Sequence, residues 1–176
     1  MIEWNISGAW LAHRLDCTPT GIQSRCHGNC CKSKVFWPPV AQPQDDGGCH
    51  HLGPAGCTLS LEDKPVACHL YPLKPNKAGT LVQHARGRLG CCKPNVGLGP
   101  FLYDAHYDSF AHLFGDEQAD MIRTNAMADP PRDTVVRVPP EVAAAFEAEE
   151  REAEANILPV PRSQRLALPA EVGEAS

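Results

Sequence analysis

The sequence predicts a small, irregular, mainly α-helical cysteine-rich domain with little β structure, followed by an α-helical acidic C-terminal extension. Only 36 of the 176 residues are Leu, Ile, Val or Phe, close to the roughly 20% below which burial hardly offsets the ordering entropy of a chain. Seventeen prolines and fourteen glycines disfavour long regular elements. All nine cysteines lie between Cys17 and Cys92, so we expect cross-links formed by these thiols to supply the missing stability.

The start of the chain and the number of cysteines indicate which kind of cross-link to expect. The opening residues MIEWNISGAW contain neither a basic segment nor the apolar run of roughly 7–15 residues that a secretory signal needs. Nowhere do about 18 apolar residues follow one another, as a membrane span requires. The cysteine count is odd, whereas disulfide frameworks usually have an even count. We therefore expect a cytoplasmic protein whose cysteines bind metal, and hence a metal-stapled domain.

Charge divides the chain at about residue 100. Residues 1–100 contain ten Lys and Arg against six Asp and Glu, a net charge of +4. Residues 101–176 contain six against fifteen, a net charge of −9. This contrast predicts separate modules. We expect a cysteine-rich metal-binding domain at 1–100, a helical extension at 101–138, and an acidic helix with an extended tail at 139–176.

Few regular elements are expected in the first hundred residues. Residues 2–15 are compatible with a short strand followed by a helical turn, and their mixed spacing does not decide between strand and helix. From Asp16 to Pro100, prolines and glycines break the chain and leave Thr80–His84 as the one plausible strand. The rest of this segment is expected to form loops and short helices.

A helix is expected between Asp116 and Met127. Asp116 follows a helix-breaking glycine and is placed to cap the helix. Ala119, Ile122 and Ala126 recur at helical spacing, so they are expected to face inward.

The most regular helix is expected at 141–156, directly after two prolines. Its narrow apolar stripe, interrupted by Glu149, consists of Val142, Phe146, Ala153 and Ile157. Because so narrow a stripe buries little surface, we expect residues from about Pro139 onward to dock on another chain or to stay mobile. A protein partner is therefore predicted for the acidic helix and tail. The run of glutamates from Glu147 to Glu154 is most simply a solvated face.

The cysteines fall into ordered blocks that suit metal ligation. Gly28 and Asn29 favour a turn whose backbone N–H groups can face nearby sulfur atoms. Such groups stabilise the thiolate, which is the form that binds metal. The blocks are Cys26-His-Gly-Asn-Cys30-Cys31, Gly48-Cys49-His-His-Leu-Gly-Pro-Ala-Gly-Cys57, Lys64-Pro65-Val-Ala-Cys68-His-Leu-Tyr71-Pro72 and the adjacent pair Cys91-Cys92.

Three of these blocks resemble, in order, the bacterial YkgJ-type cysteine-cluster proteins, a family described as a zinc- or iron-chelating domain with a CxxxCC signature. The resemblance covers roughly Cys17 to Cys92, a little under half of the chain, and the block from Lys64 to Pro72 is its most specific part. The sequence departs from the family by Lys64 where Arg is usual and by a longer insert at 33–48. The pattern is also similar to the cysteine-rich part of flagellin lysine N-methylases, which implies a 4Fe-4S cluster rather than zinc.

The number of thiols exceeds what one centre needs. A structural zinc or a 4Fe-4S cluster takes four ligands, so eight or nine cysteines imply either two centres or one centre with bystanders. The best candidate ligands are Cys26, Cys30, Cys57 and Cys68. The next candidates are Cys31, Cys49 and one of Cys91 and Cys92, because adjacent side chains diverge. Cys17 lies outside the tight blocks and is expected to be a bystander.

Histidines and acidic residues give weaker signals. His50 and His51 are expected to be solvated, whereas His27 and His69 are expected to form hydrogen bonds around the site without ligating metal. A solvated helix face is the simplest interpretation of four residues at near-helical spacing, namely Asp104, His106, Asp108 and His112.

The predicted function is that of a metal-cluster-binding protein, iron–sulfur being favoured over zinc, with a structural or electron-carrying centre. No independent catalytic activity is expected, because the chain contains no glycine-rich nucleotide loop and no second domain large enough to bind a methyl donor. Two alternatives are a cluster-dependent enzyme such as a protein methylase-like factor, and a structural component of a larger assembly. Neither nucleic acid nor a membrane is expected as a partner, since the charge of residues 1–100 is small and aromatic residues are sparse.

Overall fold

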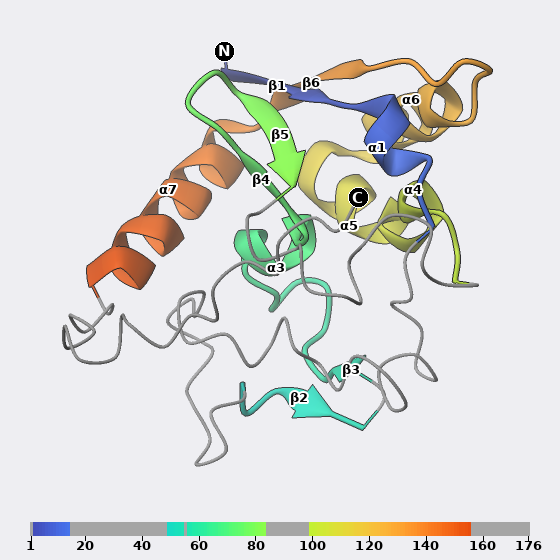
Figure 1. The fold of residues 1–176 in the computed structure, drawn as a ribbon. Helices are drawn as coiled ribbons and strands as arrows, with labels where there is room; N and C mark the ends of the chain where they lie inside the picture. The colour runs from blue at the N-terminus through green and yellow to red at the C-terminus, as the bar shows by residue number, and fades with distance from the viewer. Residues whose placement is uncertain (1, 15–48, 55, 84–98, 156–176) are drawn as a thin grey trace, which may run out of the picture.

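The computed structural model describes residues 2–14, 49–54, 56–83 and 99–155. Figure 1 shows a sheet with helices packed against it, and a small two-stranded hairpin at the opposite end of the view. Six of the nine cysteines lie outside the described residues.

Four strands form one mixed sheet in the order β4-β5-β1-β6. The central strand β1 runs parallel to β5 and antiparallel to β6, with Trp4 opposite Val136. The N-terminal strand therefore joins two segments that lie far from it in the sequence. The strands are β1 (Ile2–Ile6), β4 (Leu73–Pro75), β5 (Thr80–Gln83) and β6 (Thr134–Val138).

The sheet has one buried face and one exposed face, because successive side chains of a strand point to opposite sides. In β6, Thr134, Val136 and Val138 are buried, whereas Val135 and Arg137 are exposed. The helices pack on the face to which Val136 belongs.

Six helices and a second, two-stranded sheet complete the described structure. The second sheet pairs β2 (Leu52–Gly53) with β3 (Gly56–Cys57) in antiparallel fashion. The helices are α1 (Gly8–Leu11), α3 (Val66–Leu70), α4 (Leu102–Ala105), α5 (Tyr107–Phe114), α6 (Asp116–Ala126) and α7 (Pro140–Ala155).

Helix α1 approaches the turn before β6 very closely. Ser7 caps α1 by accepting a hydrogen bond from the Trp10 amide at 3.4 Å, and the Gly8 amide donates to the Asp133 carboxylate at 3.1 Å. A Cβ atom at Gly8 would collide with the backbone of Arg132. Only glycine fits this contact, which holds the N-terminal segment against the residues that precede β6.

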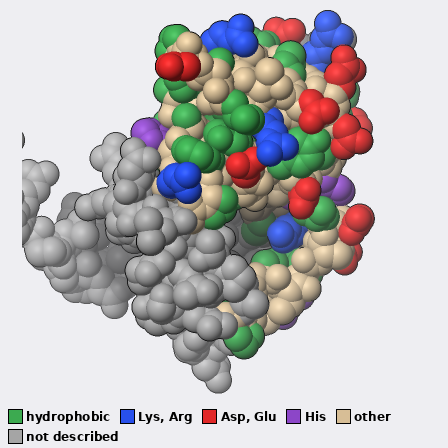
Figure 2. Space-filling model, turned by 90° about the vertical axis from the view of Figure 1, so that its right-hand side faces the viewer, with side chains coloured by type: hydrophobic (Ala, Val, Ile, Leu, Met, Phe, Trp, Pro, Cys, Tyr) green, Lys and Arg blue, Asp and Glu red, His purple; other side chains and the backbone are tan. Residues whose placement is uncertain are grey.

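Helix α6 covers the edge of the sheet. Its residue Gln118 donates a hydrogen bond to the Arg137 carbonyl at 3.0 Å and accepts one from the Arg137 amide at 2.6 Å. These two bonds satisfy backbone groups of the edge strand β6 that would otherwise invite pairing with another chain. The outer side of α6 is acidic, with Asp116, Glu117 and Asp120 exposed, and Figure 2 shows acidic side chains on this side of the molecule.

Trp4 is the centre of the apolar core. Its ring makes edge-to-face contacts with Phe114 of α5, at a centroid separation of 6.0 Å, and with Phe146 of α7, at 5.9 Å. All three side chains are almost fully buried. One core thus contains residues from each of the three segments 1–100, 101–138 and 139–176 that the sequence predicted as separate modules.

Several predicted elements are confirmed. The strand predicted at Thr80 is β5, the helix predicted from Asp116 is α6 with the expected inward residues buried, and the helix predicted at 141–156 is α7. Residues 2–15, for which the spacing does not decide between strand and helix, form a strand followed by a short helix. Two predictions are wrong: β2, β3 and β4 are further strands between residues 16 and 100, and Gly115, not Asp116, is the N-cap residue of α6. For the whole chain, the small, irregular, mainly helical fold class remains a prediction.

The buried stripe of α7 differs from the expected one. Ala143 and Phe146 are buried, and Val142 and Ala145 pack against the core. Of the other predicted stripe residues, the Ala153 side chain and Ile157 lie outside the described residues. Helix α7 therefore docks on its own chain, on the core around Trp4, and needs no second chain to bury its apolar side.

This packing predicts that Phe146→Ala destabilises the whole domain. The substitution removes a buried ring from Trp4 and leaves a cavity, which costs about 3–5 kcal/mol in the free energy of unfolding. Chemical denaturation monitored by Trp fluorescence measures the change. Ala148→Ser, at an exposed position of the same helix, should change stability by less than about 0.5 kcal/mol. Equal stabilities of the two variants would contradict the shared core.

Candidate metal centre

Three of the predicted metal ligands belong to the described residues. Cys57 and Cys68 are exposed and Cys49 is partly exposed. Cysteine is among the residue types most often buried in protein cores. Cys57 and Cys68 are exposed, so neither of them serves only to fill the core. The other predicted ligands, and the predicted bystander Cys17, lie outside the described residues; these ligands are Cys26, Cys30, Cys31, Cys91 and Cys92.

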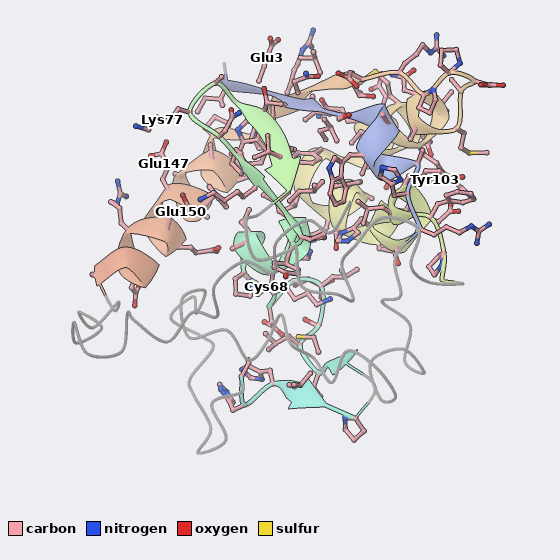
Figure 3. All side chains as sticks on the ribbon, viewed as in Figure 1. Glu3, Cys68, Lys77, Tyr103, Glu147 and Glu150 are labelled. Atoms are coloured by element: carbon pink, nitrogen blue, oxygen red, sulfur yellow. The ribbon has the colours of Figure 1, made fainter. Side chains whose placement is uncertain are left out.

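Helix α3 presents Cys68 as its one exposed side chain. Val66, Ala67, His69 and Leu70, the other four residues of the helix, are buried. Figure 3 shows Cys68 on the lower side of α3, and β2 and β3 lie below it in that view. The block of sequence around Cys68 therefore folds into an anchored turn of helix with a thiol on its outer side.

The N-terminus of α3 is capped by a residue that is distant in sequence. Glu149 of α7 accepts hydrogen bonds from the amides of Val66 at 2.9 Å and Ala67 at 2.8 Å, one to each carboxylate oxygen. No side chain of α3 or of its own N-cap residue Pro65 supplies this cap. Burial raises the pKa of Glu149, and the two amide donors act in the opposite direction. The glutamate that interrupts the apolar stripe of α7 thus has a structural role, and it is not part of a solvated face.

His69 fastens the other side of α3. Its Nδ1 lies 3.1 Å from the Ser109 hydroxyl of α5, and its Nε2 lies 2.9 Å from the Leu61 carbonyl. With both ring nitrogens engaged, His69 is not available as a direct ligand, in agreement with the sequence interpretation. Burial lowers the pKa of His69 to about 4, which keeps the ring neutral at physiological pH.

Two more histidines support the same junction. His106 places Nδ1 3.2 Å from the His69 carbonyl, and the ring of His112 stacks on that of His69 at 4.9 Å. Burial lowers the pKa of His106 to about 4. Asp104 pairs with Arg123 at 2.9 Å. The solvated helix face predicted for these residues is thus wrong for His106, which contacts α3.

The hairpin β2–β3 carries the other two described thiols. Leu52 is paired with Cys57, and the Leu52 amide donates to the Cys49 carbonyl at 3.0 Å. The amide of Thr58 donates to the His51 carbonyl at 2.8 Å, which closes the hairpin beyond Cys57. Cys49 and Cys57 therefore lie at the base of one small hairpin, and neither forms a disulfide.

Residues that border two other cysteine-bearing segments are held together. Arg14 and Phe101 form an antiparallel bridge, and the Arg14 guanidinium lies 4.1 Å from the Phe101 ring centre. The Arg14 side chain also donates to the Gly99 carbonyl at 3.0 Å. Cys17 follows Arg14 by three residues, and Cys92 precedes Gly99 by seven. The fold thus brings together the residue that precedes segment 15–48 and the residue that follows segment 84–98. These two segments together contain six cysteines. No local spacing in the sequence signals this pair.

The donor chemistry of these residues fits a thiolate-bound metal, although the described part of the chain does not complete a site. Zinc and iron–sulfur clusters both take Cys sulfur, and two described thiols are exposed. Among the described residues, no three His, Cys, Asp or Glu side chains form a group that could hold a metal ion. Further ligands would have to come from cysteines outside the described ranges.

Comparisons with known proteins do not assign the chain to a family. No protein family, no curated protein and no solved structure matches the sequence or the fold. Among the described residues, no helix is both long and apolar enough to cross a membrane.

His106 predicts acid destabilisation of the metal-free protein. His106 has a pKa of about 4 in the folded state against about 6.5 for an unperturbed histidine. The unfolded chain therefore binds the extra proton first, and this contribution to stability is complete above pH 6.5 and is lost as the pH falls toward 4. The slope for one proton is at most about 1.4 kcal/mol per pH unit.

Denaturation of the reduced, metal-free protein between pH 4 and 7 measures this dependence. His106→Asn retains a side-chain donor near the position of Nδ1 but cannot gain the proton, so its stability should fall less steeply below pH 6.5 than that of the wild type. A wild-type slope in His106→Asn would show that His106 does not titrate on unfolding.

Proposed function

We propose that this chain is a metal-cluster-binding protein in which Cys68 is one ligand of a cysteine-bound centre, iron–sulfur being favoured over zinc. The observation that supports this proposal most strongly is the structure of α3, where four residues are buried and Cys68 alone is exposed. The proposed ligands remain Cys26, Cys30, Cys57 and Cys68, followed by Cys31, Cys49 and one of Cys91 and Cys92.

The way α3 is held supports a role for Cys68 as a ligand. Residues that support a metal ligand orient it by packing and hydrogen bonds. Glu149 fixes the start of α3, and His69 connects the helix to Ser109 and Leu61.

The choice of iron–sulfur over zinc rests on the resemblance of the sequence blocks to YkgJ-type proteins and to the cysteine-rich part of flagellin lysine N-methylases. Membership of the YkgJ-type family is proposed on the same basis. The chemistry of the centre would be structural or electron-carrying, and we propose no catalytic activity of its own. A cytoplasmic location follows as part of the proposal, because thiolate-bound centres suit reducing compartments.

The structure suggests where a metal would contribute stability. The sheet and its helices share an apolar core around Trp4, Phe114 and Phe146, so this part does not depend on a metal for burial. A centre that includes Cys57 and Cys68 would instead connect the β2–β3 hairpin to α3. The metal would thus stabilise the cysteine-bearing part of the chain more than the sheet.

A protein partner at the acidic C-terminal segment remains a proposal, and the structure narrows its surface on α7. Glu149 binds α3, and Glu150 pairs with Lys74 of β4 at 3.3 Å. The exposed acids of α7 are therefore Glu141, Glu147 and Glu152 among the residues whose side chains are described. A basic surface would be the complementary partner for this side of the helix.

Metal content and stability of Cys68→Ser test the proposal. In metal-free protein the substitution leaves the four buried residues of α3 unchanged, so it should lower the free energy of unfolding less than in metal-loaded protein. In metal-loaded protein it should remove a ligand and with it the stabilisation that tight binding provides, about 4 kcal/mol at a thousandfold excess of free metal over Kd. Metal analysis, the absorbance spectrum and denaturation of anaerobically purified protein give the three readouts.

Cys17→Ser is the matched control, since Cys17 is the predicted bystander. This variant should keep the metal content and the spectrum of the wild type. Wild-type protein that holds neither iron nor zinc after anaerobic purification would contradict the proposed function. So would a Cys68→Ser variant with full metal content and an unchanged spectrum, because Cys68 could then not be a ligand.

A further inference from the structure

Helix α3 cannot hold its own position. It has only five residues, well below the length of about 12–15 at which helices become stable alone in water. The amides at its start have no acceptor within the helix, which is general for helix N-termini. Glu149, which lies on α7, supplies acceptors for two of them. It is 83 residues further along the chain than Val66.

Helix α7 has contacts with the rest of the chain besides the Glu149 hydrogen bonds. Phe146 packs on Trp4, one turn of helix before Glu149, and Glu150 pairs with Lys74 of the edge strand β4. Figure 3 shows Glu147 and Glu150 on α7, beside the hairpin of β4 and β5. These contacts help to set the position of α7 and with it the position of the Glu149 carboxylate at α3. The core is therefore coupled to α3 through α7.

We propose that Glu149 is a positioning residue of the metal centre, which orients Cys68 by fixing the first two amides of α3. The inference rests on the proposed function, since it assumes that Cys68 is a ligand. It extends that function by connecting the centre to the C-terminal helix. By linkage, occupancy of the centre should in turn stabilise the contact between α3 and α7, because coupling between two sites is reciprocal.

A purely structural role for Glu149 makes a different prediction. If Glu149 only stabilised the fold, its loss would lower global stability without changing how Cys68 meets a metal. If Glu149 orients Cys68, its loss should weaken metal binding and change the spectrum of the bound metal, even where the domain stays folded. The two roles are therefore separated by metal affinity and by spectroscopy.

Three glutamates of α7 provide a matched set of substitutions. Glu149→Gln keeps the size of the side chain but replaces one acceptor oxygen by an NH₂ group, which would face an amide donor. Glu150→Gln weakens the attachment of α7 to β4 and leaves α3 untouched. Glu147→Gln makes the same chemical change at an exposed position of the same helix. Glu149→Asp retains the charge but is too short to reach both amides, and it serves if Glu149→Gln does not fold.

The experiment uses the full chain, metal-free and reduced, with Co²⁺ as the probe. Chelator competition gives the Kd for Co²⁺, and the thiolate-to-Co²⁺ absorbance reports the geometry of the bound ion. Hydrogen exchange of peptides that span α3 is measured before the metal is added. Glu149→Gln should increase exchange in α3, weaken Co²⁺ binding by about tenfold, as is typical for residues that support a ligand, and alter the absorbance. Glu147→Gln and Glu150→Gln should retain wild-type values.

The possible outcomes separate the inference from the proposed function. If the wild type binds Co²⁺ with thiolate absorbance and Glu149→Gln binds it equally well with the same spectrum, the inference is wrong and the proposed function stands. If Glu150→Gln weakens binding as much as Glu149→Gln, general docking of α7 is responsible and the specific contact is not. If the wild type shows no thiolate-to-Co²⁺ absorbance, the inference fails; if it also holds neither iron nor zinc after anaerobic purification, the proposed function fails with it.

Discussion

The two hydrogen bonds from the start of α3 to Glu149 are the constraint on which the presentation of Cys68 depends. An isolated helix of five residues is not stable in water, and Pro65 contributes no amide to its first turn. The helix exists because α7 supplies acceptors and because α5 receives its buried side. The cost of burying the carboxylate, visible in the raised pKa of Glu149, is partly offset by two backbone donors.

On the opposite side of α3, a neutral side chain, His69, makes the polar contacts. His69 is almost fully buried, yet both of its ring nitrogens have partners, so no polar atom is left unsatisfied. His106 adds a bond to the His69 carbonyl. Polar contacts thus hold the helix at both ends, and Val66, Ala67 and Leu70 bury it in the same apolar core that contains residues of α5 and α7. Polar and apolar contacts together leave a single thiol of α3 exposed.

The sequence predicts local elements here better than long-range contacts. The spacing of Ala119, Ile122 and Ala126 suffices for α6, and the cysteine blocks suffice to select Cys57 and Cys68, which prove to be exposed. Glu149 is misread as part of a solvated face because its partners lie more than eighty residues away. The pairing of β1 with β6 is missed for the same reason, and with it the core that connects segments of opposite net charge. The difference in net charge between residues 1–100 and 101–176 does not divide the core, which contains residues from both.

Thiol footprinting tests most directly whether this anchored helix presents a metal ligand. The protein is purified anaerobically, and each cysteine is alkylated and quantified by mass spectrometry, before and after removal of the metal by a chelator. Cys68 and Cys57 should be protected in the loaded protein and react rapidly once the metal is removed, whereas Cys17 should react equally in both states. Alkylation of Cys68 at one and the same rate in loaded and metal-free protein would contradict its role as a ligand.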